Sequence, residues 1–382
     1  MSDLPPSRRR LLPTAALALA GLLAAVLPAG SAGARAPELR LNQIQVIGTH
    51  NSYRFEPPQK EFGLISAAGG SLAEGLQYSH PPLGQQFDGQ HVRQIELDVY
   101  ADPKGGAYAT PPIRALTGQP AEYDPEMKQP GTKVLHIAGI DYHSTCLTFV
   151  DCLRTVRAWS RAHPSHVPIT ILVEFKDTLD IPVKGIPPVT LISWTRDRML
   201  ALEQEIRSVL SPGELLTPDD VRTPGKTLEQ SILSGGWPTL DAARGKIMFL
   251  MDNGGAYRDR YVQDNPSLEG RVLFTDSEPG RPDAAFVERN DAAGSAAEIH
   301  DLVAKGYVVR TRADADTVEA RSGDTKARDA ALASGAQWVS TDYPVPGMAA
   351  RFGTGYFAAL PGFVTARCNP VSTPAPCTIP TP

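Results

Sequence analysis

The stretch PITILVEFKD, residues 168–177, decides the fold. Its first half is a nearly continuous apolar run rich in β-branched residues, and its last residues are charged. Such a run is typical of a strand buried on both faces, as in a parallel sheet. The stretch therefore predicts a buried strand that carries Glu174 and Lys176 at its carboxyl end.

Other parts of the chain repeat this pattern, with helical or loop segments between the runs. The further predicted strands are IQVIGTH (44–50), RQIELDVY (93–100), KVLHIA (133–138), KIMFLMDN (246–253), RVLFT (271–275), YVVRTRAD (307–314) and QWVSTDYP (337–344). The predicted helices cover 149–163, 193–210, 295–306 and 325–335, and Gly306 and Gly335 stand where a C-cap glycine would end a helix.

Strands that alternate with helices in this way predict an α/β protein with a TIM-type (β/α)8 barrel in a single domain. A doubly wound open sheet is the alternative, but no glycine-rich phosphate loop accompanies the strands. The composition is that of a globular protein, with 42% hydrophobic and 21% charged residues. The formal net charge of −5 offers no basic surface for nucleic acid. We expect a monomer without a nucleic-acid partner.

The N-terminus has the pattern of an export signal. Three arginines at 8–10 precede an apolar segment rich in Ala and Gly, which ends in the small residues SAGARA. We predict a signal peptide over residues 1–34, and SRRRLL also fits a loose twin-arginine pattern. A membrane anchor is the alternative, but Pro13 and Pro28 interrupt the segment. The protein is therefore expected to be secreted, with the barrel over residues 35–345.

The cysteines form two near-neighbour pairs. Export would bring the chain into an oxidising compartment, where disulfides persist. Four cysteines allow three pairings, and short loops favour Cys146–Cys152 and Cys368–Cys377. A zinc site is the alternative, but the spacings differ from CxxC motifs. The second pair lies in a segment rich in Pro and Thr, residues 346–382, which we expect to wrap the barrel as a loop.

Reactive side chains gather at the carboxyl ends of the predicted strands, where TIM barrels place their active sites. Residues two apart on a strand point to the same face, so Glu96 and Asp98 aim together. Carboxylate and amide oxygens suit a hard cation such as calcium or magnesium, and two histidines could serve as base and acid. The strand-end residues are His50, Asn51, Glu96, Asp98, His136, Glu174, Lys176, Arg310, Arg312, Asp342 and Tyr343.

Several of these stretches resemble one enzyme family. GTHNSYR (48–54), RQIELDVY (93–100), a histidine followed by STC, ILVEFKD (171–177) and the segment from VVRTRAD to STDYP (308–344) are similar to bacterial secreted calcium-dependent phosphatidylinositol-specific phospholipases C. The resemblance implies a TIM barrel with a Ca2+ cofactor. It also implies cleavage of phosphatidylinositol-type lipids to diacylglycerol and a cyclic inositol phosphate, with peripheral contact to a membrane.

The resemblance also implies roles for the strand-end residues. His50 and His136 would be the catalytic histidines, and Glu96 would share in proton transfer. The calcium-ligand positions would be Asn51, Glu96, Asp98 and Glu174. Lys176, Arg310 and Arg312 would hold extra phosphate, or pair with acids inside the barrel, and Tyr343 would stack on the inositol ring or pack.

The identity of the general acid and two other functions stay open. HIAGIDYHSTC (136–146) contains both His136 and His143, and the expected strand-end position favours His136. A phosphodiesterase for glycerophosphodiesters or soluble inositol phosphodiesters is an alternative, although the chain lacks HRG near the first strand and PENT. A non-catalytic binding barrel is the other alternative, although both histidines and the acids are present.

Overall fold

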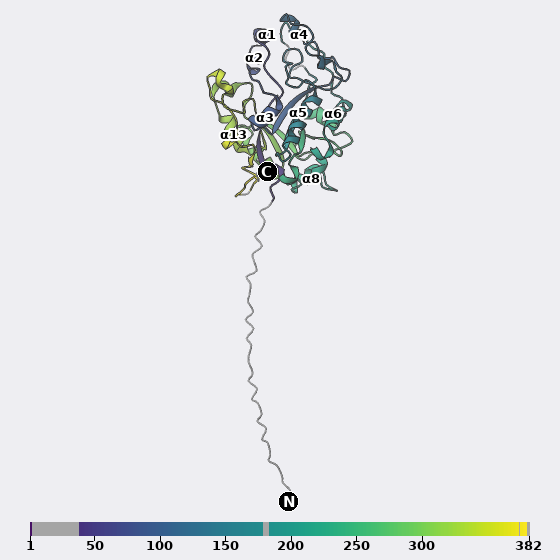
Figure 1. Cartoon of the computed structure of the whole chain (residues 1–382), viewed down its shortest axis with the longest axis vertical. Helices are drawn as coiled ribbons and strands as arrows, with labels where there is room; N and C mark the ends of the chain where they lie inside the picture. Colours follow the sequence, from purple (N-terminus) through teal and green to yellow (C-terminus); the bar gives the residue numbers. More distant parts are fainter. Residues whose placement is uncertain (2–37, 179–182, 374, 380–382) are drawn as a thin grey trace. The chain divides into compact units, whose positions relative to one another are not determined.

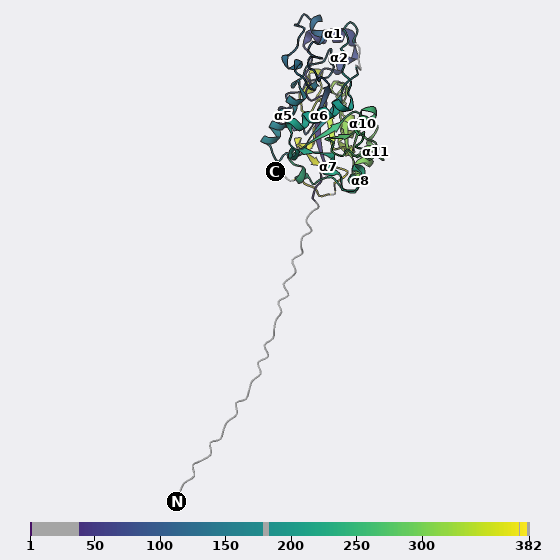
Figure 2. The ribbon, with the colours of Figure 1, turned by 90° about the vertical axis from the view of Figure 1, so that its right-hand side faces the viewer.

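The computed structural model describes Met1 and residues 38–178, 183–373 and 375–379. Residues Glu38–Pro382 form one compact unit, which contains the strands and helices shown in Figures 1 and 2. Apart from Met1, the predicted signal peptide over 1–34 lies outside the described residues. The boundary between barrel and C-terminal segment at residue 345 stays a prediction.

Parallel strands form the centre of the unit. On one side of β1 the neighbouring strands follow in the order β2, β4, β6 and β7. On its other side they follow in the order β10, β9 and β8. An isolated parallel bridge between Asp276 and Phe286 links the end of β7 to β8, so the described strands complete a ring. These strands are Ile44–Thr49 (β1), Gln94–Tyr100 (β2), Ile169–Phe175 (β4), Ile247–Met251 (β6), Leu273–Thr275 (β7), Phe286–Asp291 (β8), Val308–Arg312 (β9) and Trp338–Thr341 (β10). The ring confirms the TIM-type α/β fold.

One predicted barrel strand is wrong and another was missed. In the 133–138 run only Lys133–Val134 (β3) is a strand, and it pairs antiparallel with the end of β2. The missed barrel strand is β8, in which only Phe286 and Val287 are fully buried and the following ERND is polar. Strands were predicted from apolar runs, and β8 has only two consecutive buried apolar residues, so it was not predicted. His136 therefore lies in a loop.

The helices pack around the strands in both views (Figures 1 and 2). The predicted helices are confirmed as α5 (Phe149–Ala162), α6 (Arg196–Val209), α11 (Ala296–Lys305) and α13 (Lys326–Ser334). Gly306 and Gly335 end α11 and α13 with φ of 104° and 87°, which glycine adopts without steric cost. The other α-helices are Gln59–Gly69 (α1), Ser71–Gly75 (α2), Leu83–Gly89 (α3), Pro112–Leu116 (α4), Pro218–Val221 (α7), Leu228–Leu233 (α8), Leu240–Ala243 (α9), Gly255–Tyr261 (α10) and Val318–Ser322 (α12).

The connections that follow β1 and β2 are long and form the upper end of the unit in Figure 1. They carry α1, α2 and α4, whereas α8 lies at the opposite end in both views. Since these connections leave the carboxyl ends of their strands, the upper end is the mouth of the barrel. The remaining short elements are β5 (Leu215–Leu216) and the 3-10 helices Leu41–Gln43, Pro125–Lys128, Pro212–Glu214, Met348–Phe352 and Pro361–Phe363.

Both predicted disulfides are confirmed, Cys146–Cys152 and Cys368–Cys377. The C-terminal segment packs on the barrel through β11 (Arg367–Cys368), which pairs antiparallel with the start of β1. Disulfides persist in oxidising compartments, so the pairs indicate that the protein folds or works in one. Among the described helices, none combines the length and the apolar character that a membrane span requires.

We expect the Cys146→Ser/Cys152→Ser variant to lose about 2 kcal/mol of unfolding free energy, because the bond closes a short loop in the unfolded chain. The bond anchors the start of α5, which follows the loop that carries His136. Urea denaturation under non-reducing conditions measures the loss, with Cys368→Ser/Cys377→Ser as the comparison. Two free thiols at 146 and 152 in the unreduced protein would contradict the bond.

Candidate active site

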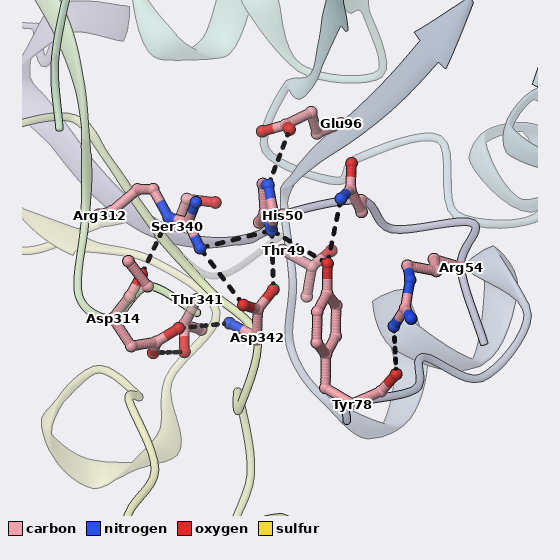
Figure 3. A network of polar contacts seen from close by, with 12 residues as sticks. Thr49, His50, Arg54, Tyr78, Glu96, Arg312, Asp314, Ser340, Thr341 and Asp342 are labelled. Atoms are coloured by element: carbon pink, nitrogen blue, oxygen red, sulfur yellow. Dashed lines mark hydrogen bonds and ion pairs between the residues drawn. The ribbon is translucent and has the colours of Figure 1, made fainter. Parts of the chain in front are cut away.

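His50 follows the end of β1 and lies at the centre of a polar network at the barrel mouth (Figure 3). Its Nδ1 lies 2.9 Å from Asp342 Oδ1, and Tyr78 Oη lies 3.2 Å from the same nitrogen. Its Nε2 faces Glu96 Oε1 at 3.6 Å, and one fifth of the side chain is exposed (20%). A carboxylate on Nδ1 favours the proton on that nitrogen, which leaves Nε2 to accept another.

The surroundings of His50 favour its neutral form. Burial lowers the pKa of His50 well below its usual value, and the nearby charges of Arg312 and Arg310 lower this pKa further. These surroundings therefore favour an unprotonated imidazole at neutral pH.

Asp342 orients His50, and no role for it was assigned from the sequence. It follows β10, which pairs with β1, and its Oδ2 accepts a hydrogen bond from Arg312 at 3.2 Å. Its backbone N–H donates to Asp314 Oδ1 at 2.8 Å, which fixes the carboxyl position. The strand end was visible in the sequence, but the pairing of β10 with β1, which brings Asp342 beside His50, was not.

Three carboxylates stand together on β2 and β4. Each of Glu96, Asp98 and Glu174 offers an oxygen, and these atoms all lie within 4.8 Å of one another. The register explains this arrangement, because Asp98 pairs directly with Glu174 and Glu96 lies two residues earlier on the same face. The structure thus brings together the three predicted carboxylate ligands.

The environment of Asp98 fits a cation. Its side chain is fully buried, and among the described residues neither of its oxygens has a partner in hydrogen-bond geometry. Burial raises the pKa of Asp98 well above its usual value, although Lys176 opposes the rise. A buried carboxylate without hydrogen bonds is costly unless a cation compensates it. All-oxygen donors suit calcium, so the residues present fit this ion.

Asn51, the predicted amide ligand, is buried next to His50. Its Nδ2 donates to Tyr78 Oη at 3.0 Å, and its Oδ1 accepts from Tyr53 Oη at 3.4 Å. Its φ of 44° lies in the left-handed region, which asparagine tolerates better than most residues. Because this contact is long, the hydrogen bond to Asn51 Oδ1 is weak and that oxygen could also bind a metal ion.

The three predicted phosphate-binding cations pair with acids of the mouth. Lys176 Nζ lies 2.7 Å from Glu174 Oε1 and 3.3 Å from Asp98 Oδ2. Arg310 is buried and hydrogen-bonded to Glu96 and to Glu288 of β8. Arg312 bonds to Asp342, as described above. In the structure these side chains act as ion-pair partners, which was the alternative reading of their pattern.

Tyr343 does not line the mouth. It is 1% exposed and packs edge-on against Phe352 and Tyr356. Its hydroxyl points to the backbone oxygen of Gln77 at 3.4 Å. The structure therefore places Tyr343 in the packing role and not in contact with a substrate ring, because no ring face is accessible on a side chain so deeply buried.

His136 lies in the loop after β3 and is held by a buried carboxylate. Its Nδ1 lies 2.7 Å from Asp141 Oδ2, and Arg54 Nε donates to the same oxygen at 2.5 Å. Tyr100 Oη also donates to the backbone oxygen of His136 at 2.7 Å. Burial raises the pKa of Asp141, but Arg54 and His136 outweigh burial and bring it to about 2. Asp141 is therefore ionised and orients His136, whose side chain is 19% exposed.

His143 has a different environment. Its Nε2 lies 2.8 Å from Glu61 Oε2 on α1, and its ring packs against Tyr142 and Phe55 at centroid distances of 4.3 and 5.2 Å. Burial raises the pKa of Glu61, but hydrogen bonds from His143 and Tyr142 hold it below its usual value. His143 thus belongs to a buried cluster that joins α1 to the loop.

The far side of the mouth carries polar residues that sequence analysis missed. Arg310 Nη1 donates hydrogen bonds to Glu288 Oε1 and, at 2.6 Å, to Asn290 Oδ1, both on β8. Burial, with the neighbouring Glu288, raises the pKa of Asp252 well above its usual value. Finding Glu288 and Asn290 required β8, whose two apolar residues gave no strand signal. Asp252 lies at the end of the predicted run 246–253, but no role was assigned to it. Asp141 and Arg54 were missed because their contact joins two loops, which no periodicity reveals.

Comparisons with known proteins identify the family and support the fold. Residues 39–370 match the family model described as phosphoinositide phospholipase C, Ca2+-dependent. Among solved structures, the fold is similar to a calcium-dependent phosphoinositol-specific phospholipase C from Pseudomonas sp., with a TM-score of 0.51 and 16% identity over 86% of this chain and 95% of that one. The same enzyme in a myoinositol complex also has a TM-score of 0.51 and 16% identity, over 87% and 96%.

A Ca2+-dependent phosphatidylinositol-specific phospholipase C from Streptomyces antibioticus is similar too, with a TM-score of 0.50 and 17% identity over 80% of this chain and 95% of that one. Among curated protein sequences, none matches the chain. Because the family model spans most of the chain, this protein belongs to the calcium-dependent phosphoinositide phospholipase C family, whose members are phosphoric diester hydrolases.

Proposed function

We propose that this chain cleaves the phosphodiester of phosphatidylinositol-type lipids with an acidic metal site and two histidines, each oriented by its own carboxylate. The observation that carries the proposal is this double pairing. His50 bonds to Asp342 at 2.9 Å and His136 bonds to Asp141 at 2.7 Å, while Glu96 lies next to His50. A non-catalytic binding barrel would not need two such pairs.

His50 acts as the general base. With its Nδ1 proton held by Asp342, its Nε2 takes the proton of the inositol 2-hydroxyl, which attacks the phosphorus within the same molecule. Intramolecular attack gains from proximity, and the first product is a cyclic inositol phosphate. Arg312 holds Asp342 from the other side, so the pair keeps its orientation as the imidazole becomes charged.

His136 acts as the general acid. Asp141 accepts from its Nδ1, so Nε2 is the atom that donates a proton to the leaving glycerol oxygen. Burial lowers the pKa of His136, and Asp141 opposes this by stabilising the imidazolium. Arg54 fixes Asp141, which ties the acid to the loop that follows His50.

Asn51, Glu96, Asp98 and Glu174 are the proposed calcium ligands. When bound, calcium would neutralise charge on the phosphoryl oxygens and lower the pKa of the attacking hydroxyl. Glu96 is proposed to serve both metal binding and proton transfer, because it belongs to the acidic cluster and its Oε1 also faces His50 Nε2 at 3.6 Å.

A substrate panel tests the function. Release of water-soluble phosphate from phosphatidylinositol vesicles is expected in calcium and to fall at least about 100-fold in excess chelator, and calcium should restore it better than zinc. Phosphatidylcholine vesicles and glycerophosphoinositol are the comparison substrates. Equal turnover in chelator would contradict the metal assignment, and a preference for glycerophosphoinositol would assign the chain to soluble phosphodiesters.

Export, a monomeric state and peripheral membrane contact are also part of the proposal. Two exposed apolar side chains support the membrane contact, Leu116 at the end of α4 and Val318 at the start of α12. Both helices lie in connections that leave carboxyl ends of barrel strands, at the same end as the site. Cosedimentation with phosphatidylinositol vesicles tests the contact, and Leu116→Ser/Val318→Ser should weaken it.

A further inference from the structure

Lys176 has an unusual position, because its ammonium group lies among the acids of the proposed metal site. Its Nζ is 2.7 Å from Glu174 Oε1 and 3.3 Å from Asp98 Oδ2. Two of the three carboxylates of the cluster are therefore compensated by this one side chain. Lys176 is the first residue after β4, and its backbone N–H still donates to the Val99 oxygen of β2 at 2.9 Å. The extended backbone therefore places Lys176 on the same side as Glu174, two residues earlier.

The third carboxylate has a different counter-ion. Glu96 accepts a hydrogen bond from Arg310, which is buried and also bonds to Glu288, Asn290 and Ser340. A guanidinium fixed by so many partners cannot move without breaking all of these contacts. Lys176 is less constrained, since the described contacts of its ammonium are with Asp98 and Glu174, and its stem is a flexible chain.

A divalent cation and the Lys176 ammonium compete for the same oxygens. Asp98 is fully buried, and its ion pair with Lys176 at 3.3 Å lies outside hydrogen-bond geometry. Its oxygens can therefore bind a metal ion once the ammonium leaves. A cation bound to Asp98 and Glu174 would also repel a positive charge only a few ångströms away. Both effects expel the lysine and leave Arg310 in place.

We propose that Lys176 is an internal counter-ion that holds Asp98 and Glu174 together in the metal-free enzyme and is displaced toward the barrel mouth when the metal binds. This inference rests on the proposed metal site. The lysine thereby weakens metal affinity, preserves the acidic site before loading, and links metal occupancy to the appearance of a free ammonium beside the substrate.

Amine labelling of the wild-type protein tests the displacement directly. An amine-reactive reagent with peptide mass spectrometry measures the labelling rate of Lys176 with and without calcium. We expect a rate increase of several-fold with calcium, because the paired ammonium is 13% exposed before loading. Lys326, whose side chain is 89% exposed, is the internal control and should not change.

Calorimetric titration with calcium provides a second measurement. Lys176→Met should bind calcium at least tenfold more tightly than the wild type, whereas the matched surface variant Lys326→Met should not differ. Without calcium, Lys176→Met should melt below the wild type, and saturating calcium should remove this difference.

The outcomes separate the inference from the function on which it rests. Calcium binding by the wild type with an unchanged labelling rate of Lys176 would overturn the displacement and leave the metal site intact. Failure of the wild type to bind calcium would overturn both. The labelling experiment uses the wild-type protein. It therefore tests the displacement even if the Lys176→Met variant does not fold.

Discussion

Replacing His50 with alanine is expected to lower kcat on phosphatidylinositol by about 10⁴-fold, the upper end of what a general base contributes. The reason is geometric. His50 Nε2 is the nitrogen at the mouth that Asp342 leaves free, so water or a neighbouring carboxylate cannot replace it in the same position. The measurement is the rate of soluble phosphate release at saturating calcium and lipid.

The His50→Ala variant should fold normally. Asp342 keeps its hydrogen bonds with Arg312 and with the Asp314 region, so the substitution leaves no unpaired buried charge. The melting temperature, measured by circular dichroism, should stay close to that of the wild type. His300→Ala, an exposed position on α11, is the matched control and should retain full activity. Near-native turnover of the His50→Ala variant would contradict the role of His50 as general base and leave it a structural role.

Much of the fold was accessible from the sequence because buried parallel strands leave a strong apolar signal. β4 and β6 are apolar nearly throughout, and both were predicted. β8 was missed because its side chains after Val287 are polar and serve the mouth, so the apolar pattern ends after two residues. The 133–138 run was misread because Leu135 and Ala138 are buried in a second apolar cluster, formed with the long connections after β1 and β2, and not in the main core of the barrel.

The site was predictable where its residues sit at strand ends in an alternating pattern. Glu96, Asp98 and Glu174 came from that rule, and the register of β2 with β4 brings them together. Asp141 and Arg54 were not predictable in this way. Their contact joins the connection after β1 to the loop after β3, and the backbone oxygens of Tyr78 and Leu76 hold the Arg54 guanidinium in place for it.

The choice of His136 as the general acid rested on a predicted strand over 133–138, of which the structure contains only Lys133–Val134. The physical requirement behind that choice was rigidity, since an acid must be held within reach of the leaving oxygen. The loop provides rigidity by other means, through the contact of His136 with Asp141 and that of Asp141 with Arg54. The open alternative, His143, is also held in place, but its Nε2 is engaged with Glu61 at 2.8 Å.

His136→Ala is therefore expected to lose about 10³-fold in kcat on phosphatidylinositol, whose glycerol leaving group needs a proton. On a substrate with a nitrophenolate leaving group, which needs no proton, the same variant should recover most of the wild-type rate. The fold should persist, because Asp141 remains paired with Arg54 at 2.5 Å when the imidazole is removed.

His143→Ala is the matched comparison. It removes a buried partner of Glu61, so we expect a lower melting temperature and a similar loss of activity on both substrates. The ratio of the two rates distinguishes the histidines, because a loss of stability affects both substrates alike whereas a lost acid affects only the one that needs its proton. If the nitrophenolate substrate rescues His143→Ala and not His136→Ala, then His143 is the acid, and its contact with Glu61 must break before the proton is delivered.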